Sequence, residues 1–461
     1  MAEIQLISPV DGTVYCERMY ADDKEIDQIL VAAKSTQPQW KAATLDERIA
    51  YCKKALMYFS DHKADIAKEI TWQMGRPIRY VEGEVVGLIE RAEVMLALAP
   101  DQLAPRSISG ASDFERYIQR DPLGTVFVIA PWNYPYLTAV NTIIPALVAG
   151  NTVVLKHSVQ TLLCAERFQK AFDFAGLPQG VFQYLHVDHS SASEIVADER
   201  IDFVAFTGSV EAGRSVEQSA AGLFKGVGLE LGGKDPAYVL SDANIPFSVE
   251  GIVDGAFFNS GQSCCGIERV YVHEHHFDEF VQRAVALVSE YQLGLPQDPS
   301  TTLGPMVNAK AADWVRQQVA QAESMGAKSC VNVNEFPSHQ GNGAYLAPQI
   351  LVDVDHSMSL MKEESFGPVL GIMSVKSDDE ALFLMNDSDF GLTASLWTAN
   401  LDVARTLGNV IQTGTVFMNR CDYLDPYLPW VGVKQSGRGC TLSHIGYEQL
   451  TRPKSFHLRL L

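Results

Sequence analysis

The sequence predicts an α/β protein with two domains, the first of them built on a doubly wound parallel sheet. Three observations lead to this fold class: helical periodicity over residues 1–90, short apolar runs that alternate with helix-length segments from residue 125, and a second such region after Gly232. Strands buried on both faces are continuously apolar, and their alternation with helices is typical of parallel sheets. Two such domains are expected to share a cleft, where small molecules are usually bound.

The N-terminal region has the periodicity of amphipathic helices. Within DDKEIDQILVAAKSTQPQW, apolar residues that would share one helical face are Ile26, Ile29, Leu30 and Ala33. The segment LDERIAYCKKALMYF repeats the pattern. We therefore expect surface helices in this region.

Five short apolar runs predict the strands of the first sheet. They are TVFVIA (125–130), TVVLK (152–156), FQYLHV (182–187), DFVAF (202–206) and VGLEL (227–231). The second region contains VYV (270–272), VLGIMSV (369–375) and TVFMN (415–419). Residues 107–123 are polar and contain glycine, so they predict an exposed hairpin outside the core.

The composition favours a protein that binds a small molecule. The 461 residues are 47% hydrophobic and 20% charged, and the net charge is -20. Nucleic acids and anionic membranes require a basic face, so neither is an expected partner. The N-terminus has no basic region followed by an apolar run, and the chain has no long apolar stretch, so we expect no signal peptide, no membrane span and a cytoplasmic location.

The eight cysteines are too sparse for a disulfide framework, and none belongs to a CxxC pair. We expect reduced thiols and no metal site. Cys264 and Cys265 are adjacent, and neighbouring side chains of an extended segment point in opposite directions. The pair is therefore either structural or catalytic.

Three motifs could contribute to a reaction. In FTGSVEAG, Gly208 and Ser209 follow a predicted strand and precede a helix, an arrangement that suits a pyrophosphate but also an ordinary turn. In LELGGKDP, Glu230 ends the predicted strand, and it is either a general base or a carboxylate paired with a lysine. Asn133 in PWNYP is either a turn former or an amide donor to developing negative charge.

Taken together, the motifs resemble those of the aldehyde dehydrogenase superfamily. The series is PWNYP, GNTVVLK, FTGSVEAG, LELGGKDP, FFNSGQSCCG, EESFGPV, NDSDFGLTAS and PWVGVKQSGRG, and it extends over nearly the whole chain. The resemblance implies a Rossmann-like dinucleotide-binding domain (1–103 and 123–231), an α/β catalytic domain (232–430) and a small β oligomerisation segment (104–122 and 445–461). It also implies a homodimer or a dimer-based tetramer.

The resemblance assigns three catalytic residues. Cys264 ends the N-x-G-Q-x-C segment and would attack the aldehyde, while Asn133 and the Cys264 backbone N–H would stabilise the oxyanion. Hydride transfer to NAD(P)+ would leave a thioester, and Glu230 would activate the water that releases the acid. Because relatives that acylate CoA generally lack this glutamate, hydrolysis is favoured over a CoA-acylating reaction. A catalytically silent homologue would be expected to have lost at least one of the three residues.

The same resemblance implies a cofactor site for NAD or NADP. Its residues would be Ile129, Trp132, Lys156, Gly208, Ser209, Leu231, Glu364 and Phe366. After Lys156 the family commonly has a Pro-(Ser/Ala)-Glu segment that repels a 2'-phosphate, whereas this chain has His157, Ser158 and Val159. The choice between NAD and NADP therefore stays open.

The substrate tunnel would be formed by Tyr134, Asn141, Phe258, Tyr423 and Leu424. Succinate-semialdehyde dehydrogenases have carboxylate-binding arginines at the positions of Asn141 and Phe258, so such a substrate is disfavoured although it remains the alternative. The aromatic side chains predict a medium aliphatic or aromatic aldehyde, or they only pack the loop.

Overall fold

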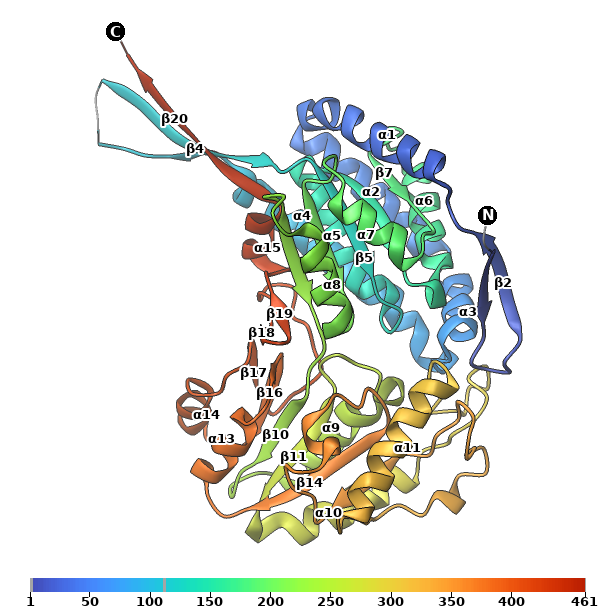
Figure 1. Cartoon of the computed structure of the whole chain (residues 1–461). Coiled ribbons are helices and arrows are strands. Elements are labelled where there is room, and N and C mark those ends of the chain that lie inside the picture. Colours follow the sequence, from blue (N-terminus) through green and yellow to red (C-terminus); the bar gives the residue numbers. More distant parts are fainter. Residues whose placement is uncertain (1–2, 111–112, 461) are drawn as a thin grey trace.

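Two large, mainly parallel sheets form the body of the molecule (Figure 1). The computed structural model describes residues 3–110 and 113–460. The first sheet has the order β19-β9-β8-β5-β6-β7. Its strands are β5 (Thr125–Ala130), β6 (Thr152–His157), β7 (Phe182–Tyr184), β8 (Phe203–Thr207), β9 (Gly226–Glu230) and β19 (Gly437–Arg438), of which β19 alone in this sheet is antiparallel to its neighbour.

Helices cover both faces of this sheet, which confirms the doubly wound arrangement. On β5, Val126 and Val128 belong to one core and Phe127 and Ile129 to another, because successive side chains of a strand point to opposite faces. The first core packs against α2 (Leu45–Asp61), α3 (Lys63–Met74), α4 (Ile78–Leu103), α5 (Pro135–Ala149) and α6 (Leu163–Ala175). The second packs against α1 (Asp23–Ala42), α7 (His189–Ala197) and α8 (Val210–Ala220).

The second sheet has the order β12-β13-β14-β11-β10-β16-β17. Its strands are β10 (Asp235–Val239), β11 (Ile267–His273), β12 (Lys328–Ser329), β13 (Gln349–Val352), β14 (Val369–Val375), β16 (Thr393–Trp397) and β17 (Thr415–Met418). Its helices are α9 (Ile245–Phe257), α10 (Phe277–Ser289), α11 (Ala309–Ser324), α12 (Ser359–Lys362), α13 (Asp378–Asn386) and α14 (Leu401–Gly408). Strands β10 and β16 were not predicted, because each is only five residues long and contains polar residues that the fold buries.

A separate three-stranded sheet extends away from the body (Figure 1). It contains β3 (Arg106–Ser107), β4 (Phe114–Pro122) and the C-terminal β20 (Thr451–Arg459), which follows α15 (Ser443–Gln449). β20 pairs with β4 in antiparallel register from Thr451↔Pro122 to Arg459↔Phe114. The predicted hairpin therefore exists, and it is extended by a strand from the other end of the chain.

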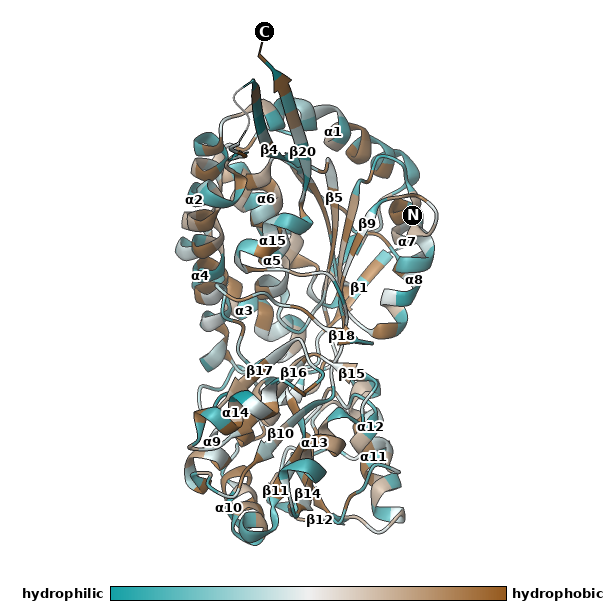
Figure 2. Ribbon diagram, turned by 90° about the vertical axis from the view of Figure 1, so that its left-hand side faces the viewer, coloured by the Kyte–Doolittle hydropathy of each residue, from teal (hydrophilic) through white to brown (hydrophobic). Residues whose placement is uncertain are grey.

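The N-terminal prediction is wrong for the first residues, which form a hairpin of β1 (Glu3–Ile7) and β2 (Val14–Met19). Ile4 and Leu6 are buried while their neighbours are exposed, which is the alternation of a strand. Helices begin at Asp23 (α1). Figure 2 shows hydrophilic and hydrophobic residues mixed along α1, as its amphipathic pattern requires.

Other elements are short. They are the pair β15 (Phe390–Gly391) and β18 (Val433–Lys434), and the 3-10 turns Val159–Thr161, Phe258–Gly261, Glu274–His276 and Val333–Glu335. The predicted strand 182–187 ends at Tyr184, and Leu185 adds one further hydrogen bond to Leu155 O. Residues 1, 2, 111, 112 and 461 of the predicted domain ranges lie outside the described residues.

Candidate active site

The cysteine loop depends on an unusual backbone at Asn259–Gly261. Asn259, Ser260 and Gly261 have φ values of 54°, 57° and 70°, a left-handed region that asparagine and glycine tolerate best. A Cβ atom on Gly261 would lie 2.2 Å from Gly367 O, so a larger residue would collide with backbone. The Gln262 amide fixes the loop further, because its Nε2 donates to Asn259 O and its Oε1 accepts from Val307 N.

The two adjacent cysteines have different environments. Cys264 is partly exposed and lines both large cavities, whereas Cys265 is 2% exposed. The Cys265 Sγ donates to Asp422 Oδ1 at 3.0 Å. A hydrogen bond with Cys264 and then burial hold the pKa of the Cys265 thiol well above its ordinary value. Of the two, Cys264 alone is accessible to a small molecule from both sides.

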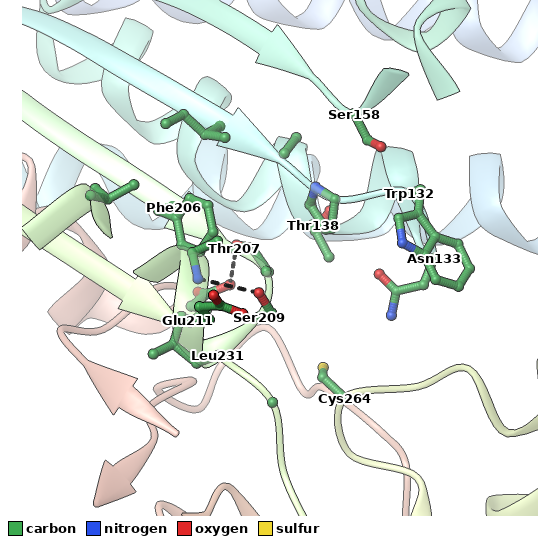
Figure 3. A pocket seen from close by; sticks show the side chains of 18 of the residues that line it. Trp132, Asn133, Thr138, Ser158, Phe206, Thr207, Ser209, Glu211, Leu231 and Cys264 are labelled. Carbon is green, nitrogen blue, oxygen red and sulfur yellow. Dashed lines mark hydrogen bonds between the residues drawn. The ribbon is translucent and has the colours of Figure 1, made fainter. Parts of the chain in front are cut away.

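Asn133 lies on the turn between β5 and α5, and its side chain is directed toward the cysteine loop. Its Nδ2 donates to Gln262 O at 3.2 Å, and the side chain is almost fully buried. Figure 3 shows the Asn133 amide and the Cys264 sulfur on facing sides of the same cavity. Because an amide nitrogen has two hydrogens, one remains available to a ligand.

Glu230 ends β9, and two threonines hold its carboxylate. Thr207 Oγ1 donates to Oε2 at 3.0 Å and Thr441 Oγ1 donates to Oε1 at 2.5 Å. Burial raises the pKa of Glu230, while these hydrogen bonds and the charge of Arg91 lower it by less. Glu230 lines the same two cavities as Cys264.

The larger cavity has a volume of about 860 Å³ and contains the eight predicted cofactor residues together with Asn133, Glu230 and Cys264. Ser209 caps α8, since its side chain accepts a hydrogen bond from Ala212 N, so the free N–H groups of this helix open at the cavity. Trp132 and Phe366 lie edge to face, 5.6 Å between ring centroids. Burial lowers the pKa of Lys156.

Glu364 is a half-buried carboxylate with spare acceptor capacity. It accepts a hydrogen bond from Gly233 N at 3.0 Å. Burial, and then repulsion by Glu268, raises the pKa of Glu364 to about 8. A Cβ atom on Gly232 would lie 2.2 Å from Glu364 Oε1, so this glycine makes room for the carboxylate.

The smaller cavity, about 350 Å³, contains all five predicted tunnel residues. Tyr134, Asn141, Phe258, Tyr423 and Leu424 line it together with Cys264 and Glu230. The aromatic rings and Leu424 make part of the wall apolar. The two cavities share Cys264, Glu230 and Leu231, so a molecule in each would meet at the cysteine.

A buried ion pair, which was not among the predicted site residues, supports this site. Arg76 Nη1 lies 2.5 Å from Glu84 Oε2, and the two side chains are 2% and 0% exposed. The Arg76 guanidinium also donates to Asn133 O and to Asn259 Oδ1, so it joins the turn before α5 to the cysteine loop. A signal was present, because Glu84 falls between Val81 and Val85 on an apolar helical face, where a carboxylate requires a partner.

These features define a class of protein. A cysteine accessible from two cavities has an amide donor beside it and a glutamate of raised pKa nearby, and the larger cavity is lined by a helix N-terminus. This combination is typical of a nicotinamide-dependent oxidoreductase. Residues 1–456 match the model of the aldehyde dehydrogenase family, and the chain belongs to that family.

Known relatives resemble the chain over nearly its full length. The succinate semialdehyde dehydrogenase [NAD(P)+] Sad of Escherichia coli is 32% identical over 96% of this chain and 95% of its own. The structure of PnpE in complex with nicotinamide adenine dinucleotide matches with a TM-score of 0.95 and 30% identity, covering 100% of this chain and 94% of PnpE.

A succinic semialdehyde dehydrogenase from Streptococcus pyogenes, in complex with NADP+, matches with a TM-score of 0.94 and 27% identity, covering 99% of this chain and 100% of its own. The prediction of NAD or NADP agrees with these cofactor-bound relatives. Other relatives of similar identity are a lactaldehyde and a betaine aldehyde dehydrogenase, so the family resemblance alone leaves the aldehyde open.

Within residues 3–110 and 113–460, no helix combines the length and apolar character needed to cross a membrane. No group of three or more His, Cys, Asp or Glu residues in the same part of the chain is arranged to hold a metal ion.

Proposed function

We propose that the protein oxidises an aldehyde to the carboxylic acid, with Cys264 as nucleophile, Asn133 as oxyanion donor and Glu230 as general base. The observation that carries this proposal is the position of Cys264 and Glu230 where the two cavities meet, with the Asn133 amide beside the cysteine loop in the larger one. The test is the absorbance of reduced cofactor across a panel of aldehydes, with NAD and with NADP. Oxidation that requires CoA would instead favour the acylating alternative.

The proposed steps use the side chains as they lie. The Cys264 thiolate attacks the carbonyl carbon, and the free Asn133 N–H and the Cys264 backbone N–H donate to the new oxyanion. When bound, the oxidised nicotinamide is the two-electron acceptor. Glu230 then takes a proton from the water that attacks the thioester carbon, and the Cys264 sulfur leaves as thiolate.

The larger cavity fits a dinucleotide. The α8 N-terminus at Ser209 would receive the pyrophosphate, Lys156 would approach the adenosine ribose, and Glu364 would accept from the nicotinamide ribose hydroxyls. Leu231, Trp132 and Phe366 would flank the nicotinamide. Glu364 supports this arrangement, because it lines the cavity and only one of its carboxylate oxygens accepts a hydrogen bond from Gly233 N, so acceptor capacity remains for ribose hydroxyls.

The predicted domain limits, oligomeric state and location are also part of the proposal. We place the dinucleotide-binding domain at 1–103 and 123–231, the catalytic domain at 232–430 and the oligomerisation segment at 104–122 and 445–461. β20 supports the last, because it is an exposed edge strand of nine residues whose unpaired backbone groups could add to another subunit. A homodimer or dimer-based tetramer and a cytoplasmic location stay predictions.

Replacing Asn133 with alanine is expected to lower kcat by about 10²- to 10³-fold, since one donor to the oxyanion is lost. Cofactor affinity should be nearly unchanged, because the amide faces the cysteine loop. Steady-state kinetics and fluorescence titration with the cofactor measure the two quantities. A kcat within threefold of the wild-type value would remove Asn133 from the mechanism.

Replacing Glu230 with glutamine is expected to slow thioester hydrolysis by about 10²- to 10⁴-fold. A stopped-flow trace should then show a stoichiometric burst of reduced cofactor followed by slow turnover. In the wild type, release should decline as the pH falls through the pKa of Glu230, which burial places above that of an exposed glutamate. Glu217→Gln, exposed on α8, is the matched control, and a Glu230 variant without a burst would argue for another base.

A further inference from the structure

Arg91 is a half-buried cation in the wall of the smaller cavity. It lies on α4 and lines the cavity with Cys264 and Glu230. Its Nη1 donates to Leu137 O at 2.8 Å and has a longer contact of 3.5 Å with Asn141 Oδ1. Throughout residues 3–110 and 113–460, Arg91 forms no ion pair with a carboxylate.

Asn141 is a second donor without a partner at the same place. It is 2% exposed, lines the cavity, and its Nδ2 has no acceptor among the described residues. Leu137 and Asn141 are one turn apart on α5, so both face Arg91. Gly87, one turn before Arg91, permits this close packing, because a Cβ atom there would lie 2.7 Å from Leu137 Cδ2.

The charge of Arg91 acts on two carboxyl groups of the cavity, Glu230 and Asp422. It lowers the pKa of Glu230 and of Asp422, in both cases against the larger effect of burial. Asp422 is already engaged, since it accepts hydrogen bonds from Ser263 Oγ and Cys265 Sγ. The other carboxylates of this wall, Glu90 and Asp254, are exposed and can be solvated by water.

We propose that Arg91 and Asn141 form a carboxylate-binding site, and that the natural substrate is an aldehyde with a carboxylate at its other end. This proposal rests on the proposed aldehyde oxidation. The Arg91 guanidinium is half-buried and has no ion pair among the described residues, so its planar N–H groups are available to match the two oxygens of a carboxylate. The apolar wall at Tyr134 and Phe258 would cover the carbon chain between the two ends.

Arg91 provides a tunnel cation that this chain lacks at the two arginine positions of succinate-semialdehyde dehydrogenases. The expected arginines are replaced by Asn141 and Phe258, which disfavoured a semialdehyde of a dicarboxylic acid. In the fold, however, a guanidinium from α4 reaches the side chain of Asn141 itself. The cation is therefore supplied by a different helix to the same region of the tunnel.

The test compares kcat/KM for 4-oxobutanoate and for butanal, which differ by the carboxylate. The wild type is expected to prefer 4-oxobutanoate. In Arg91→Gln the ratio of the two values should fall about 10- to 100-fold, because a hydrogen bond to a charged group is lost. Asn141→Ala should lower the ratio by a smaller factor, about 2- to 10-fold. Glu93→Gln, two residues from Arg91 on α4 but exposed and outside the lining of the cavity, is the matched control and should leave the ratio unchanged.

Isothermal titration calorimetry of 4-oxobutanoate with Cys264→Ala protein measures binding without turnover. Adding Arg91→Gln to this variant should weaken the binding by the same factor. An unchanged ratio in Arg91→Gln, or a wild type without preference, would overturn the carboxylate site while aldehyde oxidation stands. If the wild-type protein oxidised no aldehyde at all, the proposed function would be contradicted, and the carboxylate site would be contradicted with it.

Discussion

Replacing Cys264 with alanine is expected to lower kcat by at least about 10⁴-fold, because covalent catalysts that lose their nucleophile lose up to roughly 10⁶-fold. The cofactor should still bind, since the side chains that would hold it come from β5, β6, the start of α8 and the loop after α12. Aldehyde-dependent reduction of NAD or NADP, with fluorescence titration of the cofactor, measures both effects.

The control for this prediction is Cys265→Ser at the neighbouring position. Cys265 is buried and donates to Asp422, and serine retains a donor of similar size, so most of the activity should remain. If Cys264→Ala turned over aldehyde at the wild-type rate, or if only Cys265→Ser were inactive, the choice of nucleophile would be wrong.

Replacing Glu84 with alanine is expected to reduce the free energy of unfolding by about 3–5 kcal/mol, because it leaves the Arg76 guanidinium buried without a counter-ion. Glu84 Oε1 also accepts from Tyr136 N and Leu137 N at the start of α5, and these donors would lose their acceptor. Equilibrium unfolding in urea measures this change in the free energy of unfolding.

The matched control is Glu82→Ala, two residues away on the same helix. Glu82 pairs with Lys63 at 2.8 Å, but its side chain is 52% exposed, and surface pairs contribute about 0–1 kcal/mol. We also expect folded Glu84→Ala protein to lose activity, since Arg76 contacts both Asn133 and Asn259. Equal losses of stability in the two variants would show that the buried pair has no special role.

Much of the fold was predictable because strands buried on both faces leave a local signal. Five apolar runs marked the strands of the first sheet, and four of them agree closely with β5, β6, β8 and β9. The fifth, 182–187, extends beyond β7, which lies at the edge of the sheet. Periodicity failed at the hairpin of β1 and β2, where the alternation is short and the surrounding residues are helical.

The sequence by itself determined the loop that presents the cysteine. In FFNSGQSCCG, Asn259 and Gly261 occupy left-handed backbone, and Gln262 closes the turn on itself. These requirements are met within a few residues of Cys264, so they leave a motif that can be recognised. The motifs that contain Asn133 and Glu230 are also short, continuous stretches of sequence, so they can be recognised in the same way.

Only the tertiary structure decided what surrounds these motifs. Arg76 meets Asn259 across 183 positions of the chain, Asn133 meets Gln262 across 129, and Arg91 meets Asn141 across 50. Such contacts depend on how α4, α5 and the cysteine loop pack together, which no single segment encodes. Buried charge acts through short distances in space, so the support of the site and the cation of its tunnel became visible only when these segments were brought together.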